Sequence, residues 1–139
     1  MFPAATTSCD VTVVNAALMD TPGTGVFIVP PRPPKKPATD RSATVLREPG
    51  GSVRIVRLDD FPISYCDLIK LNVEGCEPFV LDGAREILKR FGPVVIMEEA
   101  HEKNLPDPYK KSPQRARAIL ESLGYREVSR SGHDTIWSK

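Results

Sequence analysis

Cysteine is scarce in this sequence. The three cysteines, Cys9, Cys66 and Cys76, are an odd number, and none stands at metal-ligand spacing from another. The pattern gives no basis for a closed disulfide framework and favours a reduced, cytoplasmic compartment.

Net charge and long hydrophobic runs are also missing. The formal net charge is +1, which gives no strong field to attract nucleic acid or an anionic membrane. The longest apolar runs, such as VVIM, are far too short to span a bilayer. The first residues, MFPAATTSCDV, lack a basic region followed by an apolar one, so no signal peptide is predicted. We therefore expect neither a nucleic-acid partner nor a membrane partner.

The remaining composition is that of an ordinary globular protein. Hydrophobic residues make up 40% of the chain and charged residues 27%, as in most soluble domains. A chain of 139 residues is long enough to bury one core. We predict a single domain over residues 1–139.

The N-terminal half predicts short strands joined by turns. DVTVVNAALM, from Asp10 to Met19, is rich in β-branched residues and is typical of a strand. TPGTG then predicts a turn into a second strand at VFIV. Gly23 and Gly25 resemble part of a dinucleotide-binding loop, but a strand follows them where that loop needs a helix, so they indicate a turn. SVRIVRL predicts a further strand that ends at LDDF.

Residues 30–51 form a segment dense in proline and charge. One hypothesis is a polyproline II ligand for an aromatic groove. The other is a loop inserted at the surface.

The C-terminal half has a clearer pattern. CDLIKLN predicts a buried strand that ends at Asn72, and Pro78 suits the first turn of a helix that runs to Phe91. PVVIMEE predicts the next strand, again with continuous hydrophobicity, which is the mark of parallel strands buried on both faces. A second helix follows from Ser112, and REVSR and TIWSK predict a terminal antiparallel hairpin. The predicted class is α/β.

In open α/β sheets, ligands bind beyond the carboxyl ends of the strands. One predicted strand brings Asn72, Glu74 and Glu77 to this edge, and the next brings Glu98, Glu99 and His101. Structural roles compete with chemical ones here: Glu77 suits a helix cap, and a loop histidine is often a solvated side chain. Nothing completes a set of metal ligands, so no metal is predicted.

These segments resemble a known family. LIKLNVEGCEPFVLDGA is similar to the signature of FkbM-family methyltransferases, whose usual pattern is close to LIKIDVEGAEPEVLRGA. RLDDF, VTVVNAALMDTPGTGVF and ESLGY resemble further family segments, so the resemblance spans about Val11 to Trp137. It implies a truncated Rossmann-like class I methyltransferase fold, with a mostly parallel sheet and a C-terminal antiparallel hairpin. It also implies S-adenosyl-L-methionine as cofactor and a hydroxyl of a small molecule or sugar as acceptor.

Two departures from the family pattern shape these expectations. Asn72 stands where the family usually has aspartate, and an amide cannot act as a carboxylate base. The family also begins with a strand, a glycine-containing loop and a helix, whereas this chain is expected to begin at about the third strand. The cofactor-binding residues therefore stay unassigned, and we expect weak or no cofactor binding by the chain alone.

On this interpretation the LNVEG junction is the acceptor side of a methyl-transfer site. The candidate catalytic residues are Glu74, Glu98 and His101, and the candidate substrate-binding residues are Asn72, Glu77 and Glu99. Two alternatives are a degenerate, non-catalytic binding or interaction module and a scaffold that acts through the proline-rich loop. Because the family's first strands are not recognised, the Leu68–Asn72 strand is expected to form a sheet edge. We expect the chain either to close this gap by bringing its N-terminal strand inward or to associate there with itself or a partner chain.

Overall fold

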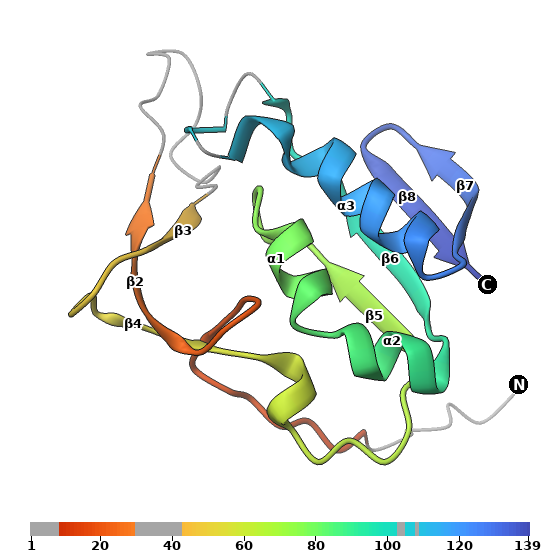
Figure 1. The fold of residues 1–139 in the computed structure, drawn as a ribbon, viewed down its shortest axis with the longest axis horizontal. Coiled ribbons are helices and arrows are strands. Elements are labelled where there is room, and N and C mark those ends of the chain that lie inside the picture. The colour runs from red at the N-terminus through yellow and green to blue at the C-terminus, as the bar shows by residue number, and fades with distance from the viewer. Residues whose placement is uncertain (1–8, 30–42, 103–104, 108) are drawn as a thin grey trace, which may run out of the picture.

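The computed structural model describes residues 9–29, 43–102, 105–107 and 109–139 (Figure 1). The strands are β1 (Ala17–Leu18), β2 (Gly23–Ile28), β3 (Thr44–Arg47), β4 (Val53–Val56), β5 (Leu68–Leu71), β6 (Val94–Glu98), β7 (Arg126–Ser131) and β8 (Asp134–Ser138). The helices are α1 (Glu77–Asp82), α2 (Arg85–Phe91) and α3 (Ser112–Ser122), with 3₁₀ turns η1 (Leu58–Asp60) and η3 (Tyr109–Lys111). None of the helices in these ranges is long and apolar enough to cross a membrane.

The predicted mostly parallel, Rossmann-like sheet is wrong. The described strands form two four-stranded sheets, with orders β1-β4-β2-β3 and β5-β6-β8-β7. Only β1–β4 and β5–β6 are parallel pairs, and the other four pairs are antiparallel. The physical reason is the length of the connections, because parallel neighbours need a long crossover whereas short turns join antiparallel strands. The sequence pattern of one strand–helix–strand crossover therefore does not determine the pairing of the other strands.

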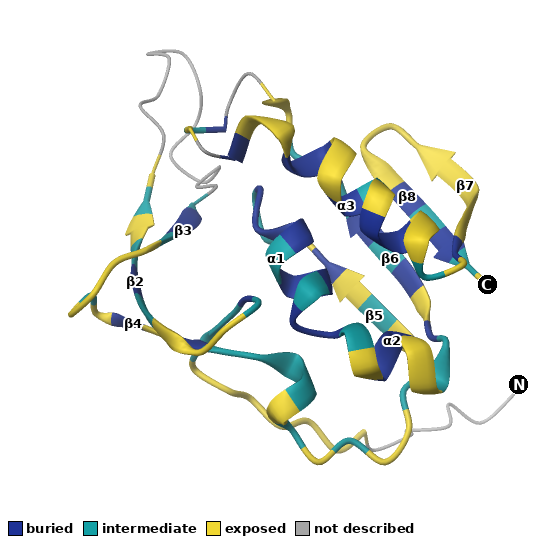
Figure 2. Cartoon of the chain, viewed as in Figure 1, coloured by how far each residue is buried: buried dark blue, intermediate teal, exposed yellow. Residues whose placement is uncertain are grey.

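The central strand–helix–strand unit is confirmed. Strands β5 and β6 are parallel and adjacent, with Leu68 opposite Val94 and Leu71 opposite Met97. The three helices cover one face of this second sheet (Figure 2), and their buried residues belong to the same hydrophobic cluster as those of the sheet. The main core lies between these two layers and includes Leu71, Leu88, Met97, Leu120 and Trp137. The predicted terminal hairpin is also confirmed as β7 and β8.

The predicted single helix from Pro78 to Phe91 is divided into α1 and α2 at Gly83 and Ala84. The carbonyl of Gly83 accepts a hydrogen bond from the backbone N–H of Asp59 (2.9 Å). The Asp59 carboxylate in turn accepts hydrogen bonds from the backbone N–H groups of Glu86 and Ile87 (3.1 Å each). Asp59 therefore satisfies free donors at the start of α2, which is the role of an N-terminal cap. Its backbone and carboxylate tie η1, next to the first sheet, to the helical layer.

The N-terminal half differs from the prediction in two places. The predicted strand from Asp10 to Met19 is regular only over β1, and residues 9–16 run along the lower border of the molecule as drawn (Figure 1). Strand β3 was not predicted, because it lies inside the proline-rich segment. Residues 30–42 of that segment lie outside the described residues, so the polyproline II hypothesis stays a prediction.

The first sheet has a smaller core of its own. Met19, Val45, Val53 and Ile55 pack with residues from outside the sheet, namely Cys76, Leu105 and Tyr109. The Tyr109 hydroxyl donates a hydrogen bond to the carbonyl of Val45 (2.8 Å). Burial of this hydroxyl raises the pKa of Tyr109 to about 12, so it stays protonated and keeps that bond at neutral pH.

Candidate functional site

The junction between β5 and α1 has an unusual backbone. Glu74 has a φ of +50°, and it is the one non-glycine residue with positive φ among the described residues. Gly75 follows with a φ of +96°, and a side chain there would come within 2.6 Å of Leu105. Left-handed backbone at a residue other than glycine costs free energy and is concentrated at functional sites. This geometry explains why glycine follows Glu74 and marks the junction as a candidate site.

Glu77 holds this junction in place. Its side chain is 2% exposed, and its carboxylate accepts hydrogen bonds from the backbone N–H groups of Gly75 (3.0 Å) and Val73 (3.3 Å). Burial raises the pKa of Glu77, although the backbone hydrogen bonds act in the opposite direction. The carboxylate thus contacts the loop that carries Asn72 and Glu74, and Glu77 is not among the residues that line the cavity next to this loop.

A cavity of about 590 Å³ opens beside the junction. Its walls come from β1 and the residues before it, from β2, β3 and β4, and from the junction itself. Apolar side chains, among them Phe27, Val45 and Val53, form much of the wall. The polar side chains that line it are Asn15, Ser52, Arg54, Asn72 and the buried thiol of Cys76, and no aspartate or glutamate is among the lining residues. The volume lies within the range of small-molecule sites.

The other predicted site residues lie elsewhere. Glu98 ends β6 opposite Asp134 and is not among the residues that line this cavity. Glu99 and His101 line a second, smaller cavity of about 170 Å³. Because β5 and β6 are parallel, Asn72 and Glu98 still emerge at the same end of their strands. The structure therefore places Asn72 in the first cavity, Glu99 and His101 in the second, and Glu74 on the junction.

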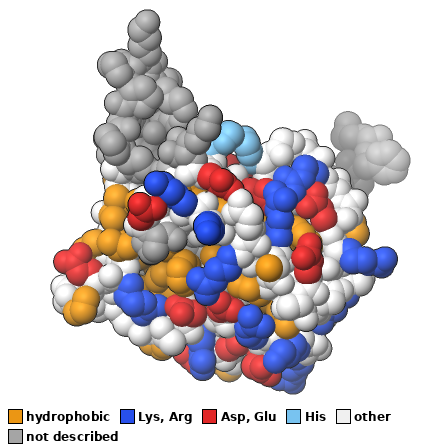
Figure 3. Space-filling model, turned by 45° about the horizontal axis from the view of Figure 1, so that its top comes forward, with side chains coloured by type: hydrophobic (Ala, Val, Ile, Leu, Met, Phe, Trp, Pro, Cys, Tyr) orange, Lys and Arg blue, Asp and Glu red, His pale blue; other side chains and the backbone are white. Residues whose placement is uncertain are grey.

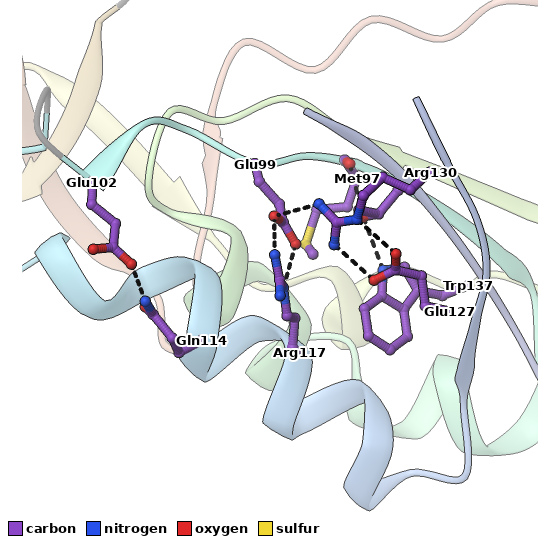
Figure 4. Close-up of polar contacts among 9 residues, drawn as sticks. Met97, Glu99, Glu102, Gln114, Arg117, Glu127, Arg130 and Trp137 are labelled. Atoms are coloured by element: carbon purple, nitrogen blue, oxygen red, sulfur yellow. Dashed lines mark hydrogen bonds and ion pairs between the residues drawn. The ribbon is translucent and has the colours of Figure 1, made fainter. Parts of the chain in front are cut away.

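Glu99 lies at the centre of an ion-pair network (Figure 4). Its side chain is only 8% exposed and accepts hydrogen bonds from Arg117 (Nε, 2.6 Å) and Arg130 (3.1 Å), and Arg130 also contacts Glu127 (2.7 Å). Burial would raise the pKa of Glu99, but the hydrogen bonds from the two arginines outweigh it and bring the pKa below 4.5. The network joins β6, α3 and β7.

Replacing Glu99 with glutamine should destabilise the protein at neutral pH by about 1–3 kcal/mol, because two partly buried guanidinium groups lose a charged acceptor. The folded-state pKa lies below 4.5, so the unfolded chain binds the proton first as pH falls. The stabilisation from Glu99 is complete at pH values well above the unfolded-state pKa and is lost as pH falls through the folded-state pKa. Urea unfolding at neutral and acidic pH should show a smaller acid-induced loss for Glu99→Gln than for the wild type.

The matched control is Glu121→Gln, at an exposed position on α3. We expect it to change the free energy of unfolding by less than about 0.5 kcal/mol. An equal loss of stability on acidification in wild type and Glu99→Gln would contradict the role assigned to this ion pair.

The two histidines of the chain meet at the second cavity. The ring centroids of His101 and His133 are 4.2 Å apart, and both residues line the cavity with Arg117 and Gln114. The backbone N–H of Glu99 donates to the carbonyl of His133 (2.8 Å), which holds the turn between β7 and β8 against the end of β6. Figure 3 shows the histidine side chains together, bordered by acidic side chains. Glu102 accepts a hydrogen bond from Gln114 at the same place.

Several residues that line these cavities were not predicted from the sequence. Asn15 lies inside the strand predicted from Asp10 to Met19, so the sequence pattern did not set it apart as a site residue. Arg54 alternates with the apolar residues of SVRIVRL, which placed it on the opposite face from the core. His133 stands in a hairpin turn, and no spacing in the sequence connects it to His101. Within the described ranges, no group of three or more His, Cys, Asp or Glu residues could hold a metal ion.

Comparison with known proteins gives one match. The sequence model of the methyltransferase FkbM domain matches residues 8–127, which includes all residues that line the larger cavity. No curated protein and no solved structure matches the chain.

Proposed function

Because the chain belongs to the FkbM methyltransferase domain family, we propose that it takes part in transfer of a methyl group from S-adenosylmethionine to a hydroxyl oxygen of a small molecule or sugar. The observation that supports this proposal is the strained junction at Glu74 and Gly75, which sets Asn72 in the wall of a cavity of suitable size. Membership of the family supports methyl transfer, and the cavity offers a place for a small ligand.

Methyl transfer to a hydroxyl requires the protein to fulfil two conditions. The two reactants must be held in line, and the hydroxyl proton must be accepted. The amides of Asn72 and Asn15 line the cavity and can orient a hydroxyl by donating and accepting hydrogen bonds. Neither amide can act as a base. We therefore keep Glu74, which is two residues from Asn72, and Glu98, at the same end of the neighbouring strand, as candidate proton acceptors.

The cavity suits S-adenosylmethionine in size but not in charge. Its volume of about 590 Å³ and its apolar walls suit a molecule with an adenine ring. The cofactor carries a sulfonium and an ammonium group against a single carboxylate, so its net charge is positive, whereas the charged side chain among the lining residues is the cationic Arg54. The residues present therefore do not fit the cofactor's positive charges, and we expect weak binding by this chain alone.

Two ligands of different charge test whether the cationic side chain of Arg54 disfavours the cofactor. S-adenosylhomocysteine lacks the methyl group and the sulfonium charge, so this chain should bind it more tightly than S-adenosylmethionine. Arg54→Gln should tighten binding of S-adenosylmethionine about two- to fivefold at low salt, with a smaller effect on the uncharged thioether. Isothermal titration calorimetry measures both affinities, and Arg126→Gln on β7 is the matched control. Tighter binding of S-adenosylmethionine than of S-adenosylhomocysteine, or no effect of Arg54→Gln, would contradict the argument.

The proposed activity has its own test. The chain is incubated with methyl-labelled S-adenosylmethionine, at concentrations above the measured dissociation constant, and a panel of sugars and hydroxylated small molecules. We expect label in an acceptor, and a loss of at least about tenfold in Asn72→Ala, because the acceptor is then poorly oriented. Ser138→Ala, on β8, is the control that should keep the activity.

One observation favours a second candidate function. The larger cavity has no carboxylate among its lining residues, and an amide stands at Asn72 where family members usually have an acid. A non-catalytic binding or interaction module would show these features. Ligand binding without any methyl transfer in the labelling assay is the result expected of such a module.

A further inference from the structure

The two edges of the second sheet differ in how they are protected. In the described part of the chain, strand β5 pairs only with β6, so its other edge presents backbone N–H and C=O groups without a strand partner. Its sequence is LIKL, and Leu68 is 55% exposed. Such edges pair readily with another strand.

The opposite edge of the same sheet is different. Strand β7 is exposed along its whole length (Figure 2). It carries Arg126, Glu127 and Arg130, and its register with β8 shifts between Glu127 and Ser129. Charged side chains and a bulge both hinder the addition of a further strand. Strand β5 has a single charged residue, and its register with β6 is regular. The unpaired edge that favours strand addition is therefore β5.

The chain also carries an unpaired strand-forming sequence. Residues Val11–Asn15, which we call the valine segment, read VTVVN and are rich in the β-branched residues that favour strands. Val11 is 78% exposed and Val13 is 87% exposed, and within the described residues this segment pairs with no strand. The segment leads directly into β1, which pairs with β4 in the other sheet. It is thereby tied to the sheet that does not contain β5.

We propose that the valine segment of one copy of this chain adds as a strand to the free edge of β5 in a second copy, and that the exchange is reciprocal. Each copy then supplies one donor segment and one acceptor edge, which is the self-complementary arrangement of a symmetric dimer. Backbone hydrogen bonds provide the affinity in strand addition, and alternate side chains provide the specificity. A second copy is the occupant because the chain itself contains both complementary parts. The proposed dimer does not rest on the proposed function, but Val14 and Asn15 of the valine segment also line the larger cavity, so strand exchange would change that part of its wall.

The dimer is measured by sedimentation equilibrium of the full chain over a range of concentrations. We expect a mass that rises from 15.3 kDa toward twice that value, with a dissociation constant on the order of 1–100 μM, as for small interfaces. Val13→Pro should weaken dimerisation about tenfold or more, because proline removes a backbone donor and cannot join the interior of a sheet. Leu68→Lys should have a similar effect, because it places a charge on the accepting edge.

The matched control is Val128→Lys, a residue 59% exposed on β7, at the other edge of the same sheet. It should leave the dissociation constant unchanged within about twofold. Thermal unfolding of all variants shows whether each one folds. Because Val13 and Leu68 lie in separate parts of the monomer, the two variants test the interface independently. A wild-type chain that stays monomeric at all concentrations overturns the proposal. A dimer that both variants retain, or that Val128→Lys also abolishes, overturns it as well.

Discussion

Replacing Gly83 with alanine is expected to destabilise the protein by about 3 kcal/mol or more, the upper end of what overpacking costs. A Cβ at Gly83 would lie 2.2 Å from the carbonyl oxygen of Met19 and 3.0 Å from its carbonyl carbon. Both are backbone atoms next to β1, so no rotation of a side chain can relieve the contact. The carbonyl of Gly83 also accepts the hydrogen bond from Asp59, and a shift of this segment would weaken the cap of α2.

Urea unfolding followed by circular dichroism measures this effect. The matched control is Gly23→Ala in β2, where a Cβ would meet only the end of the flexible Arg47 side chain at 3.0 Å. We expect a change of less than about 1 kcal/mol for this control, because the arginine can move aside. Equal stability of Gly83→Ala and Gly23→Ala would show that the close approach of Gly83 to Met19 is not a constraint.

Replacing Trp137 with alanine is the second substitution with a large expected effect, about 3–5 kcal/mol. Trp137 lies on β8 and is 2% exposed in the main core between the second sheet and the helices. Its indole N–H donates to the hydroxyl of Thr135 (2.9 Å), and that hydroxyl donates to the carbonyl of Met97 (3.1 Å). The substitution therefore opens a cavity and also removes a donor from a buried hydrogen-bonded chain.

Differential scanning calorimetry should show a lower melting temperature for Trp137→Ala. A loss of this size is a large fraction of the roughly 5–15 kcal/mol by which native proteins are stable. Val128→Ala, on the neighbouring strand β7 and exposed, should change stability by less than about 0.5 kcal/mol. A similar small change for Trp137→Ala would mean that the C-terminal hairpin contributes little to the core.

The sequence predicted those parts of the fold whose signals are local. The parallel pair of β5 and β6 and the hairpin of β7 and β8 follow from short apolar runs and turn residues, and both are present. The division of the helix at Gly83 depends on Asp59, which lies 24 residues earlier and makes contacts that no periodicity reveals. Strand β3 was hidden by the prolines that precede it. The arrangement in two sheets depends on which strands pair, and that is set by tertiary contacts.

The candidate site was predictable to a similar extent. The junction at Glu74 and Gly75 was selected from the sequence, because a strand that ends before a helix marks the edge where ligands bind. The hydrogen-bond and ion-pair partners of the candidate site residues could not be predicted from the sequence. The structure places Glu77 under the loop backbone and Glu99 between two arginines. Arg117 and Arg130 lie 18 and 31 residues from Glu99 in the sequence, so only the folded chain brings them together.

The division into two sheets has a consequence for how the molecule opens. The sheets share no backbone pairing within the described residues, and contacts such as those of Asp59 with α2 and Tyr109 with Val45 hold them together. Units joined in this way open at a lower free energy than units joined by a continuous sheet. The larger cavity is lined by residues of the first sheet and by residues of the junction between β5 and α1, so it lies at the seam between the two units. Amide exchange in the first sheet should therefore report whether a ligand occupies this cavity. A ligand that bridges the seam would slow that exchange at positions it never touches.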